Sequence, residues 1–359
     1  MNPILLPVTP NSPCYKNQKT SEGVFQLKTF GNFNFIQNVL FDSQLIKYDD
    51  KYQNNQSHSK VFQRHMAEVY ALLRYQFPKG TKLVEVGCGK GSFLEIVRDD
   101  KWFDYEGYDE AYEGRDENIY RRYLNYDDRI EADIVVLRHT LEHIKAPFDF
   151  LSMLRKIFGD KAFVFIEVPQ FSWIDKHKVL FDFTYEHVNY FSTESLCSLF
   201  GEVMSLGDFF GGQYQYCLAS LGKLNDDDWH GFNLKENWRD FNFDEYLSAF
   251  KNFIKILDSK KRVWVWGGAT KGVLFLKHLF ENSPSNFKKI ESVIDANPKK
   301  QSFFTPSTNL PIISPNNLYP ILKDGDYIIV MNPNYLNEIK IELANKTDAS
   351  INIEALMLF

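Results

Sequence analysis

The sequence predicts an α/β fold, with a doubly wound parallel-sheet unit followed by a second, smaller unit of the same kind. Apolar strand-like runs alternate with amphipathic helical stretches, which is typical of parallel sheets. Glycine-rich turns directly follow two of these runs, at 87–91 and 267–272. The chain has 359 residues, more than one hydrophobic core usually spans, so two units fit its length.

The first unit is predicted over residues 61–225. It opens with a helix over 62–77, where apolar side chains recur at helical spacing, and the following Pro-Lys-Gly ends that helix. Strands are expected within 83–86, 103–111, 132–139 and 161–170, with helices from Phe93 and over 148–157 between them.

The second unit is predicted over 260–359, where strand, glycine turn and helix restart in KRVWVWGGATKGVLFLKHL. Its further strands are expected in KIESVIDANP, DGDYIIVMNPNY and INIEALML. Residues 226–259 are expected to form a helix that connects the units, because apolar side chains repeat from Tyr246 to Ile256. Residues 1–60 lack clear periodicity, and we expect tight turns or an arm lying on the rest of the protein.

Composition excludes several classes of function. The formal net charge is −6 and no basic stripe stands out, which argues against a nucleic-acid partner. The four cysteines form no C-x-x-C pair, so neither a structural zinc site nor a disulfide scaffold is expected. We see neither a signal peptide nor an apolar run of membrane-spanning length, so we expect a cytoplasmic enzyme without membrane association. The oligomeric state stays open.

The first glycine turn has the sequence V-E-V-G-C-G-K-G-S-F. Its spacing is G-x-G-x-G with Glu85 two residues before the first glycine, which differs from the G-x-G-x-x-G of dinucleotide-binding folds. It closely resembles the first motif of class I (Rossmann-like) methyltransferases, which implies S-adenosylmethionine as cofactor. The alternative is a glycine-rich turn of another nucleotide-binding enzyme. The cofactor-binding residues expected in and around this turn are Glu85, Gly87, Cys88, Gly89 and Gly91.

Asp109 ends the second strand, where a carboxylate can accept hydrogen bonds from both hydroxyls of a ribose. This order of loop and acid supports the same cofactor. Arg138 and His139, at the end of the third strand, and Ser57, before the first helix, are also expected on the cofactor side.

Two histidine clusters follow strands of the first unit. R-H-T-L-E-H-I places His139 and His143 one helical turn apart, beyond the carboxyl end of a strand, where α/β proteins bind ligands. The spacing H-x-x-E-H is not that of zinc proteases, and with no third ligand evident we expect no metal. The second cluster, Y-E-H-V-N-Y-F-S, offers Tyr185, Glu186 and His187 as a general base with its neighbours; the alternative is a helix cap with a surface histidine.

From about Phe41 onward the chain resembles the sugar C-methyltransferase family, whose members act on deoxysugars attached to nucleotides. The shared motifs are LIKYDDKYQNNQSHSKVFQRH, the first glycine turn, R-H-T-L-E-H-I, I-E-V-P, Y-E-H-V-N-Y-F-S, W-G-G-A-T-K-G, I-D-A-N-P and N-P-N-Y. The resemblance implies that His187 is the base with Glu186 beside it, and that His143 lies near the reacting sugar. The implied reaction removes a proton next to a ketone, and the resulting enolate takes the methyl group.

The second glycine turn, W-G-G-A-T-K-G, would direct backbone N–H groups of 268–272 and the side chains of Thr270 and Lys271 at an anion, unless it is only a tight turn. We expect these two residues, Asn189 and Asn332 to contact the substrate. The resemblance implies a Rossmann-like C-terminal domain that helps to close over the substrate.

The sequence departs from the family at several positions. The cysteine-rich zinc module is missing, and GVFQLKTFGNF is interpreted as its metal-free remnant. Thr184 and Asn54 stand where sugar-modifying members often carry tyrosines. We therefore weigh three functions: C-methylation of a nucleotide-linked keto-sugar or related keto compound, O- or N-methylation of another small metabolite, and a non-catalytic relic that only senses the cofactor.

Overall fold

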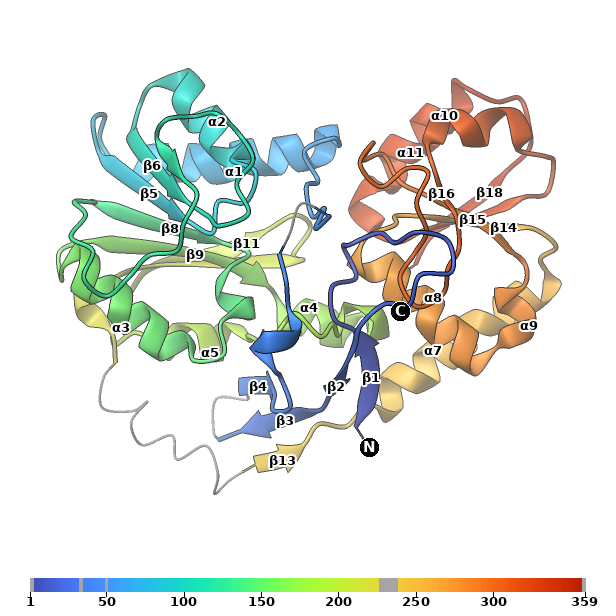
Figure 1. Ribbon diagram of the computed structural model, residues 1–359, viewed down its shortest axis with the longest axis horizontal. Helices are drawn as coiled ribbons and strands as arrows, with labels where there is room; N and C mark the ends of the chain where they lie inside the picture. Colours follow the sequence, from blue (N-terminus) through green and yellow to red (C-terminus); the bar gives the residue numbers. More distant parts are fainter. Residues whose placement is uncertain (1–2, 32–34, 49–50, 226–237, 357–359) are drawn as a thin grey trace.

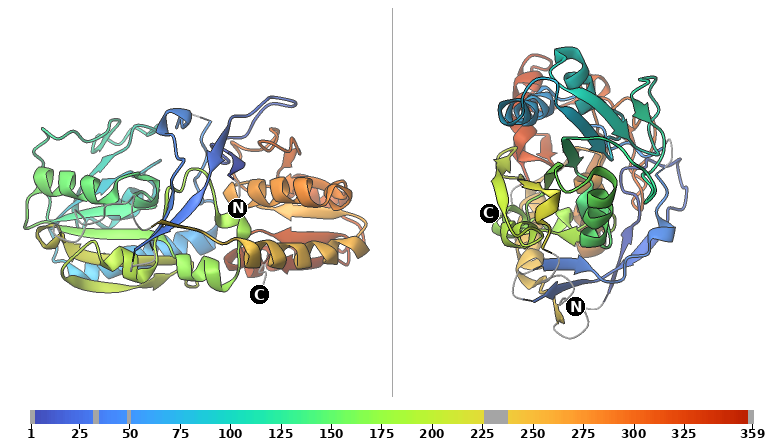
Figure 2. Two further views of the ribbon diagram at one scale, coloured as in Figure 1. Left: turned by 90° about the horizontal axis from the view of Figure 1, so that it is seen from below. Right: turned by 90° about the vertical axis from the view of Figure 1, so that its left-hand side faces the viewer.

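The computed structural model describes residues 3–31, 35–48, 51–225 and 238–356. Two α/β domains lie side by side, and a small sheet built largely from the N-terminal segment lies next to the first (Figure 1). Viewed from below, the N-terminal segment runs between the two domains (Figure 2). The predicted fold class is confirmed, since each domain contains a largely or fully parallel sheet.

The first domain is built on a seven-stranded sheet in the order β11-β12-β9-β8-β5-β6-β7. The strands from β9 to β7 run parallel. At one edge β12 pairs antiparallel with β9, and β11 pairs antiparallel with β12, so β12 alone runs against the other strands. The bounds are β5 Lys82–Val86, β6 Asp104–Tyr108, β7 Ile119–Tyr120, β8 Ile134–Arg138, β9 Phe163–Pro169, β11 Val203–Phe209 and β12 Tyr214–Ser220.

Helices cover both faces of this sheet because successive strand residues point to opposite sides. Leu83 and Val136 pack with α1 (Lys60–Gln76) and α2 (Ser92–Asp100), whereas Val84 and Val135 pack with α3 (Pro147–Phe158). The helix predicted over 62–77 is α1, whose first turn is capped by the Ser59 side chain. Shorter helices near the sheet are η2 Leu141–His143, α4 Phe171–Lys176, η3 Leu180–Asp182, α5 Thr193–Cys197 and η4 Leu221–Lys223.

The N-terminal segment forms strands rather than a featureless arm. A hairpin of β1 (Ile4–Pro7) and β2 (Glu22–Phe25) precedes a four-stranded sheet in the order β10-β4-β3-β13. In this sheet, β4 pairs with a strand that begins two residues after His187, so the N-terminal segment supports the second histidine cluster. The bounds are β3 Leu27–Phe30, β4 Phe35–Asn38, η1 Ser43–Leu45, β10 Asn189–Tyr190 and β13 Trp238–Asp240.

The connection between the domains contains a helix that is shorter than the predicted segment 226–259. Residues 226–237 lie outside the described residues, and β13 occupies part of the remainder. Helix α7 spans Asp244–Ile256 and is followed by η5 (Leu257–Ser259). Tyr246, Phe250 and Phe253 form its buried stripe, which is the periodicity that predicted a helix here.

The second domain is a five-stranded, fully parallel sheet in the order β16-β15-β14-β17-β18. Helices α7, α8 and α9 cover one face and α10 and α11 the other (Figure 1). The bounds are β14 Val263–Trp266, α8 Thr270–Asn282, α9 Pro284–Phe287, β15 Ile290–Ile294, β16 Ile312–Ile313, α10 Pro315–Leu318, η6 Tyr319–Ile321, β17 Tyr327–Val330, η7 Pro333–Tyr335, α11 Leu336–Ala344 and β18 Asn352–Ala355.

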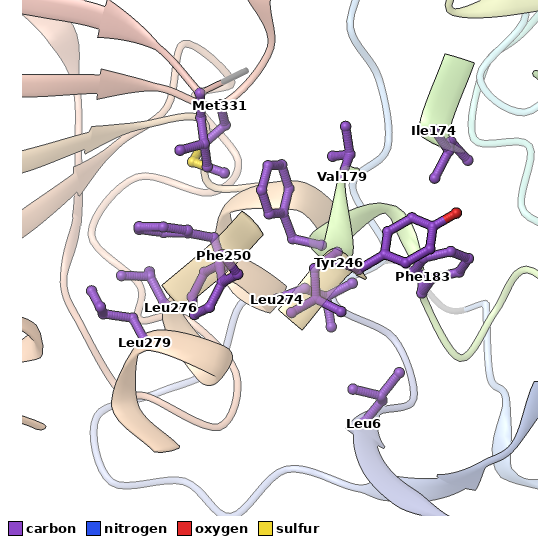
Figure 3. Packing of buried hydrophobic residues seen from close by; sticks show 14 of the residues in the cluster. Leu6, Ile174, Val179, Phe183, Tyr246, Phe250, Leu274, Leu276, Leu279 and Met331 are labelled. Carbon is purple, nitrogen blue, oxygen red and sulfur yellow. The ribbon is translucent and has the colours of Figure 1, made fainter. Parts of the chain in front are cut away.

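One apolar core joins the N-terminal hairpin to the second domain. Leu6, Phe183, Tyr246, Phe250 and Leu274 belong to this cluster and converge from four separate parts of the chain (Figure 3). Burying each such side chain contributes roughly 1.5–3 kcal/mol. This core therefore packs the N-terminal hairpin, helix α7 and the second domain against one another. No helix among the described residues has the length and apolar character needed to cross a bilayer.

Candidate active site

A cavity of about 970 Å³ lies between the two domains. Turns at the carboxyl ends of both parallel sheets line it, which is where α/β proteins bind ligands, and the N-terminal segment closes one side. Its volume is at the upper end of the range for small-molecule sites. The lining includes Asn11, Tyr48, Tyr52, Glu85, Gly87, Cys88, Gly89, Asp109, Arg138, His139, Glu142, His143, Glu186, His187, Thr270, Lys271 and Asn332.

The first glycine turn follows β5 and needs its glycines for two different reasons. Gly87 has φ of 79°, and a Cβ there would lie 2.4 Å from Oγ1 of Thr140. Gly89 has φ of 57°, but a Cβ there would meet no protein atom within 4 Å. The turn at Gly87 is therefore required by packing, whereas Gly89 leaves space on the cavity side for a ligand to approach the backbone.

Asp109 lies directly after β6, as predicted. Its carboxylate accepts hydrogen bonds from the backbone N–H groups of Gly89 and Ala111, both at 2.7 Å. These bonds hold the glycine turn and the end of β6 together. A carboxylate oxygen can accept more than one hydrogen bond, so Asp109 retains capacity for ligand hydroxyls.

A group of buried ionisable side chains joins β8, β9 and α1. Arg138 donates to Oε2 of Glu167 at 2.8 Å, and Nε2 of His65 lies 2.7 Å from Oε1 of the same carboxylate. Burial opposes ionisation of Glu167, but Arg138 and His65 outweigh it and hold the pKa of that carboxyl well below its usual range. Burial raises the pKa of Glu85 to about 8, opposed by the charge of Arg138.

These residues fit S-adenosylmethionine, whose methionine part carries an ammonium and a carboxylate. Among the described residues, Nη2 of Arg138 and Oε2 of Glu85 are buried without a hydrogen-bond partner, so a cationic donor and an acceptor remain free. Unpaired buried polar groups are costly, and a ligand with matching charges would satisfy both. Asp109 would serve the ribose.

The imidazoles of His143 and His187 meet edge to face, with ring centroids 4.9 Å apart. Burial lowers the pKa of His143. Burial, together with the charges of His143, His139 and Lys271, holds the pKa of His187 well below its usual range. Both rings are therefore neutral near pH 7, and an unprotonated imidazole in a cavity can accept a proton.

Tyr48 orients the imidazole of His143. Its hydroxyl lies 3.3 Å from Nδ1 of His143, and the His143 ring also bonds the backbone carbonyl of Glu186. A neutral imidazole has one N–H, and when that group donates to the carbonyl, Nδ1 accepts from Tyr48. Burial raises the pKa of Tyr48 well above its usual value, so the phenol stays a donor.

Glu186 contacts the N-terminal segment through its carboxylate. The Tyr52 hydroxyl donates to Oε2 of Glu186 at 2.7 Å, and Asn11 also hydrogen-bonds this carboxyl. Burial raises the pKa of Glu186 to about 7, while Tyr52 and the charge of Lys300 oppose the shift. The carboxylate of Glu186 is therefore hydrogen-bonded by two side chains of the N-terminal segment.

The second glycine turn brings Thr270 and Lys271 to the cavity as predicted. Lys271 forms an ion pair with Asp182, and Asn11 donates to Oγ1 of Thr270 at 2.8 Å. Asn332 also lines the cavity and donates to Gln213 at 3.0 Å, across the domain boundary. Contact of these three residues with substrate stays a prediction.

Four predicted site residues do not line the cavity. Tyr185 is fully buried, and its hydroxyl bonds the backbone N–H and carbonyl of Asp42. Asn189 uses its amide to bond Gln37 and two backbone carbonyls near η2. Gly91 is the N-cap of α2, and Ser57 lies in the turn before α1 with its backbone bonded locally. Direct contact of these four residues with cofactor or substrate stays a prediction.

The sequence did not single out several cavity residues. Asn11 comes from a segment without periodicity, whereas Tyr48 and Tyr52 lie within the shared motif LIKYDDKYQNNQSHSKVFQRH but had no assigned role, and their partners lie far along the chain. Glu142 lay within a recognised motif but had no assigned role. The pairing of Tyr52 with Glu186 spans 134 residues, and no local pattern reports such a contact. The expectation that no metal is needed stays a prediction.

Comparison with known families agrees with this geometry. Residues 58–203 match a methyltransferase domain, and residues 229–353 match the C-methyltransferase C-terminal domain. A comparison with curated proteins finds no match to this sequence.

Solved methyltransferase structures are similar over less than half of the chain. An S-adenosylmethionine-dependent methyltransferase from Archaeoglobus fulgidus has 18% identity and a TM-score of 0.34, over 44% of this chain and 93% of its own. A possible histamine N-methyltransferase from Thermotoga maritima has 16% identity and a TM-score of 0.34, over 46% and 90%. The plantazolicin methyltransferase BpumL, solved with S-adenosylhomocysteine, has 16% identity and a TM-score of 0.26, over 34% and 52%.

The glycine turn, the sheet around it and the first family match define an S-adenosylmethionine-dependent methyltransferase of class I. The second match is more specific. The chain combines a methyltransferase domain with a C-methyltransferase C-terminal domain, and its cofactor is S-adenosylmethionine.

Proposed function

We propose that this enzyme methylates a carbon atom next to a ketone, with His187 as the base that forms the enolate. A nucleotide-linked keto-deoxysugar is the first candidate for the substrate. The observation that carries the proposal is the neutral imidazole of His187 in the cavity that also holds the glycine turn. The match to a C-methyltransferase domain favours carbon over oxygen or nitrogen as the acceptor.

The chain's own residues supply the proton-transfer step. His187 takes the proton from the carbon next to the ketone, the C–H electron pair forms the enolate double bond, and negative charge moves to the carbonyl oxygen. Tyr48 lines the same cavity and stays protonated, and turning its O–H from Nδ1 of His143 to that oxygen would stabilise the enolate. Bound S-adenosylmethionine supplies an electrophilic methyl group to the nucleophilic carbon.

Amide side chains support a substrate rich in hydroxyl groups. An amide both donates and accepts hydrogen bonds, which suits sugar hydroxyls. Small-molecule sites usually contain only a few polar groups, and the wall of this cavity contains more amide side chains than that. The cavity amides are Asn11, Asn54, Asn55, Gln56, Gln213 and Asn332.

The test is a transfer reaction with S-adenosylmethionine carrying a ¹³C-labelled methyl group. The acceptors are dTDP-4-keto-6-deoxyglucose, its GDP counterpart, and the same sugars reduced to the alcohol. We expect a new methyl group bonded to carbon, located by long-range carbon–proton NMR correlations, with the keto acceptors only. A methyl group on oxygen or nitrogen, or equal transfer to the reduced sugars, would refute enolate chemistry.

A further inference from the structure

Glu142 is a buried carboxylate without a hydrogen-bond partner among the described residues. It lies in η2, directly before His143, and its side chain is 1% exposed. Neither carboxylate oxygen has a hydrogen-bond partner, although Glu142 lines the cavity. An isolated buried charge is costly. A neighbouring side chain that becomes positively charged, or a cationic group of a ligand, would therefore stabilise this carboxylate.

Three imidazole side chains lie close to this carboxylate. Nδ1 of His139 lies 3.5 Å from Oε1 of Glu142. A Glu142 oxygen and ring nitrogens of His143 and His187 lie within 4.8 Å of one another. At such distances in a buried site, a full negative charge interacts strongly with a proton on either imidazole. The negative charge of Glu142 already favours protonation of His143 and raises its pKa against the effect of burial.

Three other carboxylates near the cavity already have partners. Glu186 accepts from Tyr52 and Asn11, and Glu167 is bonded by Arg138 and lies 2.7 Å from His65. Asp182 forms an ion pair with Lys271. Of these three and Glu142, Glu142 alone has no hydrogen-bond partner among the described residues, and it lies close to the His143–His187 pair.

Protonation of His187 needs an offsetting negative charge. The groups that face it are His143 and His139 after β8, Lys271 at the start of α8, Glu142 in η2, the adjacent Glu186 and Tyr190 of β10. The first three oppose a positive charge on His187, and so does burial. A base in this position would be weak without a carboxylate to stabilise the imidazolium.

We propose that Glu142 is the counter-charge of the His143–His187 pair and stabilises the imidazolium that forms when His187 accepts the substrate proton. This inference rests on the proposed function. In the step, the C–H bond breaks, the proton forms an N–H bond on His187, and the electron pair remains in the enolate. Glu142 keeps its charge throughout and touches no reacting atom, so it is a positioning residue that acts through the imidazole.

The test measures exchange of the substrate's α-proton with D₂O, using S-adenosylhomocysteine-bound enzyme and dTDP-4-keto-6-deoxyglucose as probe. Wild type is compared with E142Q, E142D and the surface control E68Q on α1. We expect E142Q to slow exchange about 10- to 100-fold and E142D to restore part of the rate, with E68Q at the wild-type rate. The glutamine in E142Q removes the negative charge of Glu142 but keeps the shape of the side chain.

Two further readouts separate this role from a structural one. The thermal midpoint of E142Q should equal or exceed that of wild type, because an unpaired buried charge is removed. The acidic limb of its pH–rate profile should move to lower pH with a lower plateau, since His187 becomes a weaker base that stays unprotonated further into acid. Exchange by E142Q at the wild-type rate would overturn the role of Glu142 alone. No exchange by wild type would overturn the proposed function and this inference together.

Discussion

Asp109 has two tasks at the scale of a single residue. It fixes the glycine turn through Gly89 and Ala111, and it remains able to accept from ribose hydroxyls. We predict that Asp109→Ala weakens binding of S-adenosylmethionine about 10- to 100-fold, corresponding to loss of about 1.5–3 kcal/mol from charge-assisted bonds. Isothermal titration calorimetry measures the change.

Asp127→Ala is the matched control for this variant, because Asp127 is exposed and does not line the cavity. The control should bind the cofactor like wild type. Unchanged affinity in Asp109→Ala would mean that the ribose binds elsewhere.

Burial of Glu85 predicts a dependence of stability on pH. The folded protein raises the pKa of Glu85 to about 8, whereas an unfolded chain leaves it near about 4.5. The neutral form is therefore favoured in the folded state. This contribution is fully present below about pH 4.5 and is lost as the pH rises through about 8. We predict that the thermal midpoint of the cofactor-free protein falls from pH 5 to pH 8.

Glu85→Gln should flatten that fall, because an amide does not ionise, and Glu95→Gln on the exposed side of α2 should not. Thermal denaturation at several pH values makes the comparison. An equally steep fall in Glu85→Gln would show that Glu85 ionises freely in the folded protein. Glu186, whose pKa is raised to about 7, contributes in the same direction and leaves a residual slope.

At the scale of elements, the turn after β5 can be tested with a matched pair of glycines. Gly89 and Gly80 both have positive φ, and a Cβ at either would meet no protein atom within 4 Å. Alanine at either site should cost about 1–2 kcal/mol of stability from backbone strain. Only Gly89 lines the cavity, so we predict that Gly89→Ala loses cofactor binding and Gly80→Ala keeps it.

Chemical denaturation and calorimetry on both variants check this prediction. Equal cofactor affinity in the two would contradict a close approach of the ligand to the turn.

The segment before α1 gives a second prediction at this scale. Tyr52→Phe removes the hydroxyl that donates to Glu186 and leaves a buried carboxylate with fewer partners. We predict turnover about tenfold slower or worse, a further rise in the pKa of Glu186, and cofactor affinity close to wild type. Steady-state kinetics and calorimetry measure these changes, with Tyr75→Phe as control because Tyr75 is 86% exposed. Wild-type turnover in Tyr52→Phe would contradict a role of Glu186 in the reaction.

Local patterns predicted most of the elements in the two α/β domains. The strands before both glycine turns and helix α1 follow from short-range periodicity, and Asp109 follows from its place at a strand end. The small sheet could not be predicted this way. Its strands come from positions as far apart as Lys28 and Asp240, and each is only two to four residues long.

At the scale of the whole molecule, the site exists only when three regions meet. The first domain contributes the glycine turn and both histidines, the second contributes Thr270 and Lys271, and the N-terminal segment contributes Tyr48 and Tyr52. The sequence predicted His143 and His187 because their motifs are local. It missed the tyrosines because the contacts that give them a role form across the fold. Tyr185 and Asn189 show the converse: they neighbour the proposed base in sequence, but neither lines the cavity, and their side chains are bonded to the backbone of Asp42 and Ile144. Their contact with substrate stays a prediction.

The most direct test of the account is exchange of the proton next to the ketone in wild type and in His187→Asn, followed by NMR in D₂O. The enzyme carries S-adenosylhomocysteine, so no methyl transfer can occur, and dTDP-4-keto-6-deoxyglucose is the probe. We predict exchange catalysed by wild type and a loss of at least about 100-fold in His187→Asn, with cofactor affinity retained. Exchange at the wild-type rate in the variant would contradict the central claim that His187 is the base.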